Sequence, residues 1–177
     1  MNECPPADAW KVCYRELAPR LLLFARQWVA DLADAEDVVQ TAFVKFWKHQ
    51  PDARREHWPL LYSAVRTTAL DTLRGAERRG RREADPAVDV LREDGAYFDA
   101  GVEQREEAAL VAAALQHLSA EQREVVVLRV WGELTFAEIA ATLGESINTV
   151  ASRHRYALEA LRRHLQPRVQ EREPLKT

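Results

Sequence analysis

The chain is short of the residues on which secreted and membrane-spanning proteins depend. Its 177 residues include two cysteines, Cys4 and Cys13, too few for the disulfide framework of a small secreted domain. The longest purely apolar run covers eight residues, 108–115, whereas a spanning helix needs about 20, so we expect no membrane insertion. The first residues, Met-Asn-Glu-Cys-Pro-Pro, lack the basic segment and apolar core of a signal peptide. The cytoplasm is therefore the expected compartment.

The sequence also lacks the motifs of common enzyme classes. Its five histidines have no cysteine partners at metal-ligand spacing, and there is no HExxH, P-loop or G-x-S-x-G motif. We therefore expect no catalytic residues, no metal and no cofactor. Glycine is also scarce, with six residues, and no segment alternates as a strand does. The abundance of Ala, Leu, Arg, Glu and Gln, all good helix formers, predicts an all-α protein.

Charge is spread unevenly along the chain, although the net charge is only −3. Residues 74–83 hold five arginines and two glutamates, and residues 146–177 hold seven basic and three acidic side chains. Two such segments are typical of two anion-binding surfaces, although solvated helix faces give the same pattern.

The stretch between the basic segments is acidic and shows weak apolar periodicity. Residues 84–104 hold one arginine and six acids, together with Pro86, Gly95 and Gly101. This composition predicts a linker over residues 84–104. The linker would join two small helical domains, residues 1–83 and 105–177.

Apolar residues at three- and four-residue spacing predict three helices in the first domain. The first covers about residues 8–30, the second begins at Asp34–Asp37 and ends at Pro51, and the third carries Pro59 in its first turn. Their inward residues are expected to be Trp10, Tyr14, Leu17, Leu21, Phe24 and Trp28, then Val38, Ala42, Phe43 and Phe46, then Leu61, Val65, Ala69 and Leu73.

The start of the second helix is unusually acidic. Asp34 can cap the helix, and acids in a first turn favour the helix dipole. Asp34, Glu36 and Asp37, with Asp31 just before them, exceed what capping requires. A docking surface for a basic partner is the alternative interpretation.

Three aromatic residues flank the segment His49–His57 and also allow two interpretations. Trp47, Trp58 and Tyr62 are either part of the core or a platform on which unpaired DNA bases stack beside arginines.

The second domain carries three consecutive helix signals. Capping boxes at Ser119–Gln122 and Thr135–Glu138 predict two helices, which stop at Gly132 and Gly144. Ser146 is placed to cap a third helix that ends near Pro167. Its inward residues are expected to be Ile147, Val150, Tyr156 or Ala157, Leu158, Leu161 and Leu165. A short helix, a three-residue turn with glycine and a longer basic helix predict a helix-turn-helix motif, against the plainer alternative of an αα-hairpin.

Over about residues 10–165 these motifs resemble the extracytoplasmic-function (ECF) group of sigma-70-type sigma factors, the promoter-recognition subunits of bacterial RNA polymerase. The segments 18–26, 34–43 and 58–74 resemble sigma region 2. The segments 118–125 and 134–140 resemble region 4.

The resemblance implies partners and roles for particular residues. The implied partners are core RNA polymerase, promoter DNA and an anti-sigma factor. Core polymerase would be bound through its β′ coiled coil and its β flap. The β′ coiled coil would be contacted by Asp34, Glu36 and Asp37. Single-stranded −10 DNA would be contacted by Asp52, Arg54, Arg55, Trp58, Tyr62, Arg66, Asp71 and Arg74. The −35 duplex would be contacted by Thr149, Ser152, Arg153, Arg155 and Tyr156. The linker would pass toward the polymerase active-site channel.

The chain departs from the family pattern at two positions. Thr67 stands where asparagine is common, so the promoter-strand contact of that asparagine is not expected here. Ala151 stands where lysine or arginine is common, so we expect a shifted −35 preference.

Other function classes fit the residues less well. A free-standing helix-turn-helix regulator leaves the motifs of the first domain unexplained, and a helical adaptor leaves the basic helix unexplained. An enzyme is disfavoured because the sequence lacks the catalytic motifs named above.

Overall fold

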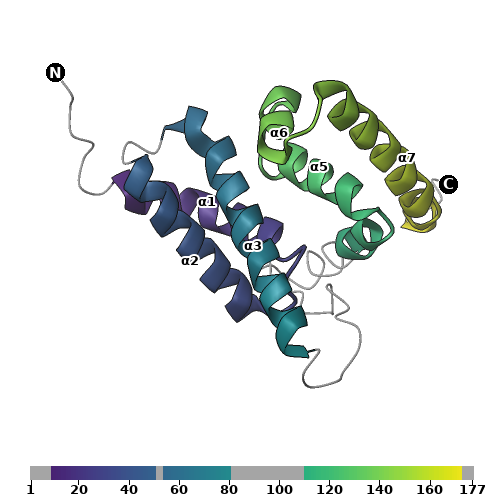
Figure 1. Cartoon of the computed structure of the whole chain (residues 1–177). Coiled ribbons are helices and arrows are strands. Elements are labelled where there is room, and N and C mark those ends of the chain that lie inside the picture. The colour runs from purple at the N-terminus through teal and green to yellow at the C-terminus, as the bar shows by residue number, and fades with distance from the viewer. Residues whose placement is uncertain (1–8, 51–53, 81–109, 173–177) are drawn as a thin grey trace.

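The computed structural model describes residues 9–50, 54–80 and 110–172, and within these ranges every regular element is a helix. The prediction of an all-α protein is therefore confirmed. Figure 1 shows the helices as two groups, one from each half of the chain. Asp52, Cys4 and the predicted linker 84–104 lie outside the described residues.

The N-terminal half is built from three helices that pack on one another. They are α1 (Ala9–Ala25), α2 (Leu32–His49) and α3 (Trp58–Gly80), with a short 3₁₀ turn, η1 (Arg55–His57), before α3. The predicted inward faces of α2 and α3 are confirmed, except that Leu73 is half-buried. Tyr14 meets the Phe43 ring edge-on at 5.0 Å, and Phe24 meets Tyr62 edge-on at 5.5 Å, so aromatic contacts join the three helices.

Two predicted boundaries in this half were wrong. α1 ends at Ala25, because the chain then tightens into a turn in which Gln27 N donates to Phe24 O and Trp28 N to Ala25 O. α2 begins two residues before Asp34, and its N-cap is Asp31, whose carboxylate accepts from Ala33 N at 3.2 Å. Asp34 therefore lies in the first turn and has no capping role.

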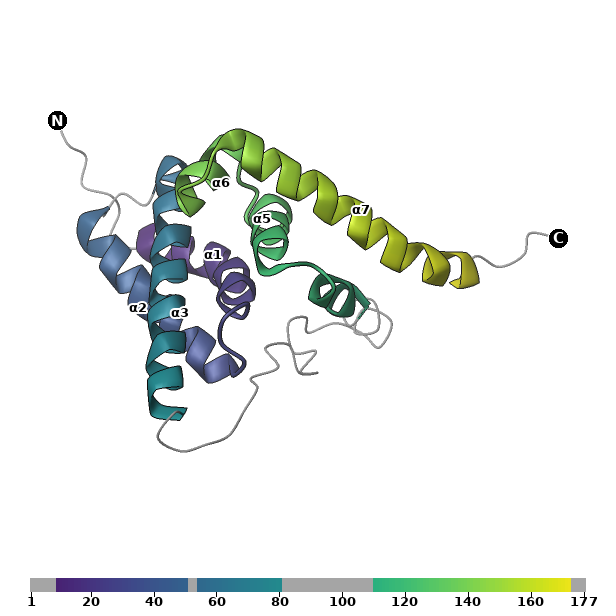
Figure 2. The ribbon, with the colours of Figure 1, turned by 45° about the vertical axis from the view of Figure 1, so that its right-hand side comes forward.

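The C-terminal half contains α5 (Ala120–Val130), α6 (Phe136–Leu143) and α7 (Ile147–Arg172), preceded by helical residues 110–116 (Figure 2). Both predicted capping boxes are present, at Ser119 and Thr135. The Ser146 hydroxyl accepts from Thr149 N at 3.0 Å, as expected of a cap for α7. Residues 144–146 form the three-residue turn between α6 and α7, so these helices form the predicted helix-turn-helix.

Three expectations for α7 were wrong, namely its end near Pro167 and the burial of Ile147 and of Leu158. The helix continues past Pro167 to Arg172, because one missing N–H does not stop a helix whose following residues are good helix formers. Ile147 and Leu158 are about half exposed. Of the two alternatives Tyr156 and Ala157, alanine is the buried residue and tyrosine is exposed.

The two halves also pack against each other, which the sequence alone does not predict. α1 contacts α5, and α3 contacts α6. One continuous cluster of buried side chains includes Leu21 and Leu61 from the first half and Leu128, Leu134 and Ile139 from the second. The halves therefore share an apolar core in this structure.

Gly144 at the turn of the helix-turn-helix provides a test of the fold. It is the C-cap of α6 with φ 70° and ψ 31°, a left-handed conformation in which a Cβ atom is strained although nothing lies within 4 Å of it. Gly144→Ala should lower the free energy of unfolding by about 1 kcal/mol, and Gly144→Asn by less, because asparagine tolerates this conformation. Urea titrations of the three proteins measure the difference. Equal losses for Ala and Asn would contradict the strain argument.

Candidate nucleic-acid and partner interfaces

Four of the residues expected to contact −10 DNA form a strip along the start of α3. Arg55, Trp58, Tyr62 and Arg66 follow one another at three- and four-residue steps, which place them on one helix face. The Arg55 guanidinium lies over the Trp58 ring, 4.4 Å from its centroid. Arg20 of α1 adds a third arginine to this surface, since Arg20 and Arg55 both contact Glu133. We call Arg20, Arg55 and Arg66 the arginine strip.

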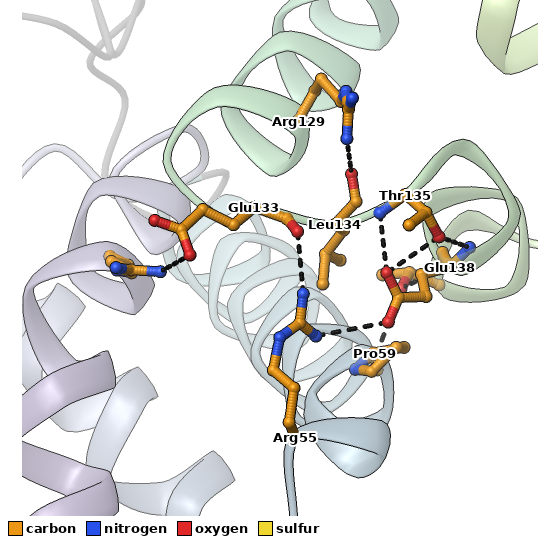
Figure 3. A network of polar contacts seen from close by, with 9 residues as sticks. Arg55, Pro59, Arg129, Glu133, Leu134, Thr135 and Glu138 are labelled. Carbon is orange, nitrogen blue, oxygen red and sulfur yellow. Dashed lines mark hydrogen bonds and ion pairs between the residues drawn. The ribbon is translucent and has the colours of Figure 1, made fainter.

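In this structure the arginine strip faces carboxylates of the C-terminal half. Figure 3 shows Arg55 between Glu133 and Glu138. Arg55 Nη1 lies 3.3 Å from Glu138 Oε1, and Arg55 Nη2 donates to the Glu133 carbonyl oxygen at 2.8 Å. Arg20 Nη1 lies 3.0 Å from Glu133 Oε2. The angle at that contact does not meet hydrogen-bond geometry, so it is an ion pair only.

The third pair of the strip is the most buried one. Arg66 Nε donates to Glu124 Oε1 at 2.8 Å, and the Glu124 side chain is only 8% exposed. Burial raises the pKa of Glu124, and the hydrogen bond and charge of Arg66 partly offset that effect. We call Glu124, Glu133 and Glu138 the glutamate cover, because each engages one or two members of the arginine strip.

Glu138 and Glu133 carry further local constraints. Burial alone raises the pKa of Glu138, but hydrogen bonds from Thr135 and the charge of Arg55 outweigh it and lower the pKa overall. Glu133 has φ 55°, the only positive φ of a non-glycine residue within the described ranges. A glutamate in this conformation is strained, and it lies in the turn after α5, where Gly132 N donates to the Val127 carbonyl oxygen and Leu134 N to the Leu128 carbonyl oxygen.

The two aromatic residues of the α3 face are covered in this arrangement. Trp58 is 8% exposed and Tyr62 is 1% exposed. Neither the Trp58 indole N–H nor the Tyr62 hydroxyl has a hydrogen-bond partner in the described part of the chain, and burial raises the pKa of Tyr62. Both residues are therefore core residues in this conformation, as one interpretation of the sequence expected. Trp47 stacks on Phe43, with ring centroids 6.4 Å apart.

The other residues expected at −10 DNA lie outside this contact. Arg54 is exposed and lies 3.7 Å from Glu56. Asp71 and Arg74, both more than 60% exposed, pair with each other at 3.2 Å on α3. Thr67 is exposed and donates its hydroxyl hydrogen bond to the Ser63 carbonyl at 2.9 Å. The residues expected to contact −10 DNA thus fall into two groups, one that lies at the contact with the C-terminal half and one that is exposed.

The acids at the start of α2 form an open surface. Asp34, Glu36 and Asp37 are exposed, while Ala35 and Val38 between and after them are buried. Asp31 supplies the cap, so none of these three carboxylates is needed for it. An exposed set of uncommitted acids matches the docking interpretation better than the capping one.

On α7 the expected −35 residues are arranged around an exposed helix face. Ser152, Arg155 and Tyr156 are exposed, and the Arg155 guanidinium lies over the Tyr156 ring at 4.9 Å. Arg153 pairs with Glu145 at 3.1 Å, and the Thr149 hydroxyl lies 2.8 Å from that of Ser146. Ser152, Arg155 and Tyr156 are therefore the members of the set that solvent reaches most freely.

The members of this interface that the sequence did not single out are Arg20, Glu124 and Glu133, and Glu138 was predicted only as part of a capping box. Arg20 interrupts the apolar face of α1 between Leu17 and Leu21, and Glu124 directly precedes the buried run 125–128. The sequence feature that could have indicated these residues is a charged side chain within or beside a run of buried residues. This feature does not identify the ion-pair partner of the charged side chain, which lies 58 residues or more away in the sequence.

Two other kinds of site were searched for in the described ranges. No group of three or more His, Cys, Asp or Glu side chains is arranged to hold a metal ion there. No described helix combines the length and apolarity that crossing a membrane requires.

Comparisons with known proteins match both halves. A family model described as Sigma-70 region 2 matches residues 13–79, and one described as Sigma-70, region 4 matches residues 114–163. The chain is 36% identical over 151 residues to the RNA polymerase sigma-E factor of Streptomyces avermitilis, covering 84% of this chain and 80% of that protein. It is 32% identical over 168 residues to the ECF RNA polymerase sigma factor SigL of Mycobacterium tuberculosis, covering 90% of each.

Two solved structures share the fold. One is the sigma factor RpoE in complex with the anti-sigma factor NepR from Bartonella quintana, with a TM-score of 0.67 and 23% identity, covering 90% of this chain and 98% of that one. The other is CnrH in complex with the cytosolic domain of CnrY, with a TM-score of 0.61 and 25% identity, covering 92% and 90%.

Proposed function

The chain belongs to the ECF sigma factors of the sigma-70 family, and from this premise we propose how its parts divide the work of promoter recognition. As an ECF sigma factor it is a transcription initiation factor of RNA polymerase and not an enzyme. The N-terminal domain, residues 1–83, binds core polymerase and reads the −10 element. The C-terminal domain, residues 105–177, reads the −35 element, and the linker 84–104 passes toward the active-site channel.

The observation that carries this proposal is the helix-turn-helix with its exposed face. α6, the turn 144–146 and α7 have the geometry in which the second helix enters a major groove. Ser152, Arg155 and Tyr156 lie on the exposed face of its first three turns. Arginine matches guanine edges and phosphates, so this face suits duplex DNA.

The N-terminal half supplies the other two contacts of the proposal. The exposed acids Asp34, Glu36 and Asp37 dock on the β′ coiled coil, while the C-terminal domain meets the β flap. Arg54, Asp71, Arg74, Asp52 and the face of α3 from Arg55 to Arg66 contact the single-stranded −10 element. Arginines beside aromatic rings are the side chains that hold unpaired DNA.

We also propose an anti-sigma factor as the regulator of this chain and the bacterial cytoplasm as its place of action. One structure of the same fold was solved with an anti-sigma factor bound, and polymerase is the partner on which sigma factors act.

Run-off transcription tests the proposal directly. A library of genomic promoter fragments is transcribed by bacterial core polymerase with and without the full-length protein. We expect discrete transcripts only when both proteins are present, and we expect their start sites to share two elements upstream. If the protein alone slowed promoter fragments in a gel-shift assay but gave no transcript with core polymerase, it would not act as a sigma factor, and the proposal would be refuted. Core polymerase with a different sigma factor, on a promoter which that factor recognises, is the positive control.

A further inference from the structure

The contact between the halves places acidic side chains where the proposed function needs DNA. The arginine strip and the glutamate cover form a set of paired charges that joins α1 and α3 to α5, α6 and the loop between them. From this arrangement we infer that the C-terminal half is an intramolecular competitor of single-stranded DNA, whose carboxylates occupy the arginine strip in place of phosphates. The inference rests on the proposed function, in which this face of α3 meets the −10 strand.

The pairing matches what a phosphate backbone would require. Each arginine of the strip meets an oxygen anion at 2.8–3.3 Å, the range of charge-assisted hydrogen bonds and close ion pairs. Arg55 makes two contacts with its guanidinium, one to the Glu138 carboxylate and one to the Glu133 carbonyl. Carboxylate and phosphate oxygens are both acceptors for the arginine fork, so one can replace the other there.

The contact also covers the aromatic part of the same face. Trp58 and Tyr62 are buried within the apolar cluster that the two halves share, and the Thr142 hydroxyl of α6 lies 3.3 Å from the Pro59 carbonyl oxygen of α3. Neither ring is open to a base in this arrangement. The closed arrangement is thus incompatible with base stacking at this face.

Two features show that the closed contact is not optimised for permanence. The core that the two halves share contains the Trp58 N–H and the Tyr62 hydroxyl without hydrogen-bond partners in the described residues, which lowers its stability. The halves are joined through residues 81–109, a segment of 109 − 81 + 1 = 29 residues, enough chain to reach roughly 95 Å when extended. Covalent connection therefore does not prevent separation.

The −35 face remains open in the same arrangement. Ser152, Arg155 and Tyr156 on α7 are exposed while the strip on α3 is covered. Competition should therefore act on single-stranded DNA and leave binding of a duplex unchanged. A general electrostatic effect of the acidic chain would act on single-stranded and duplex DNA alike, so this selectivity distinguishes the two explanations.

The test neutralises the glutamate cover without changing its shape. The variant Glu124→Gln, Glu133→Gln, Glu138→Gln keeps side-chain size, and glutamine at position 138 preserves the capping box of α6. The matched control is Glu16→Gln, Glu121→Gln, Glu159→Gln, three exposed glutamates that make no described contact between the two halves. Both variants change the net charge from −3 to −3 + 3 = 0.

The measured quantity is the Kd of the full-length protein for a labelled oligothymidylate of about twelve nucleotides, a length that single-stranded DNA sites accommodate. A half-exposed ion pair contributes a factor of about 1.5 to 5, so loss of three pairs predicts binding about tenfold tighter than in the control variant. Adding Arg66→Ala to the cover variant should remove most of the gain. Affinity for a −35 duplex should differ little between the two variants.

Small-angle X-ray scattering of the same proteins separates two kinds of failure. Affinity no greater than that of the control, at an unchanged radius of gyration, would overturn the competition itself. A larger radius without a gain in affinity would mean that the halves separate but the strip does not bind DNA, and the proposed role of α3 would then fail. A tenfold gain that depends on Arg66 supports the inference at either radius.

Discussion

Replacing Glu36 and Asp37 by alanine should weaken binding of core RNA polymerase by about 2 kcal/mol, or about thirtyfold in Kd. The two carboxylates are exposed on α2 and make no ion pair within the described residues, so they are available to a basic partner. Truncating one side of close charge pairs at an interface costs this order of free energy. Transcription at limiting sigma factor should fall in proportion.

The fold should survive this double substitution. Both positions lie beyond the first turn of α2, the cap at Asp31 is untouched, and alanine is the better helix former. The control variant Glu16→Ala, Glu56→Ala removes two exposed acids from the same half and should leave affinity for core polymerase nearly unchanged. Fluorescence anisotropy against labelled core polymerase, with circular dichroism of each variant, gives both quantities. Equal losses in the two variants would mean that total charge, not the α2 surface, governs docking.

The second large effect is expected on α7, where two exposed arginines should play different parts. Replacing Arg155 by alanine should cost about 1–3 kcal/mol in −35 binding and relax the base preference at one or two positions. Arg155 is exposed, and its guanidinium is supported by the Tyr156 ring and hydroxyl, the latter at 3.2 Å. A guanidinium held in this way is prepared for a bidentate contact to guanine.

Arg162 is the matched comparison on the same helix. It lies seven residues further on, about 10 Å along the helix axis, and is also exposed. Its replacement by alanine should weaken all sequences alike and lower the salt slope of binding by about one, as loss of a phosphate contact does. A panel of −35 duplexes titrated over a salt series measures both. If Arg155→Ala kept the ranking of the panel and only lowered affinity, Arg155 would be a phosphate contact.

The sequence was sufficient to predict those parts of the structure that depend on residues close together in the chain. Ser119 and Thr135 each cap a helix together with a partner three residues on, and Gly144 ends α6 in the left-handed conformation that favours glycine. The helix-turn-helix follows from these features alone. The same reasoning placed the buried stripe of α2 correctly, because a period of 3.6 residues identifies one face.

Periodicity failed where two faces of a helix are both partly apolar. Ile147 and Leu158 fit the apolar spacing of α7 but are half exposed, since only a narrow stripe through Val150 and Ala157 meets α5 and α6. No local sequence pattern predicts the contact between the two halves. Arg55 and Glu138 are 83 residues apart, and a charged residue in a sequence does not reveal whether its partner is solvent, DNA or a distant helix.

The order in which the chain is made gives the contact between the halves a further meaning. The arginine strip is complete once α3 has been synthesised to Gly80, whereas its cover requires α6 and is complete only at Leu143. Those 143 − 80 = 63 residues take about 3–13 s to translate at 5–20 residues per second. During that interval the arginine strip of the nascent N-terminal half has no glutamate of the C-terminal half to pair with. A chaperone or polyanion near the ribosome therefore meets a surface that the finished protein conceals.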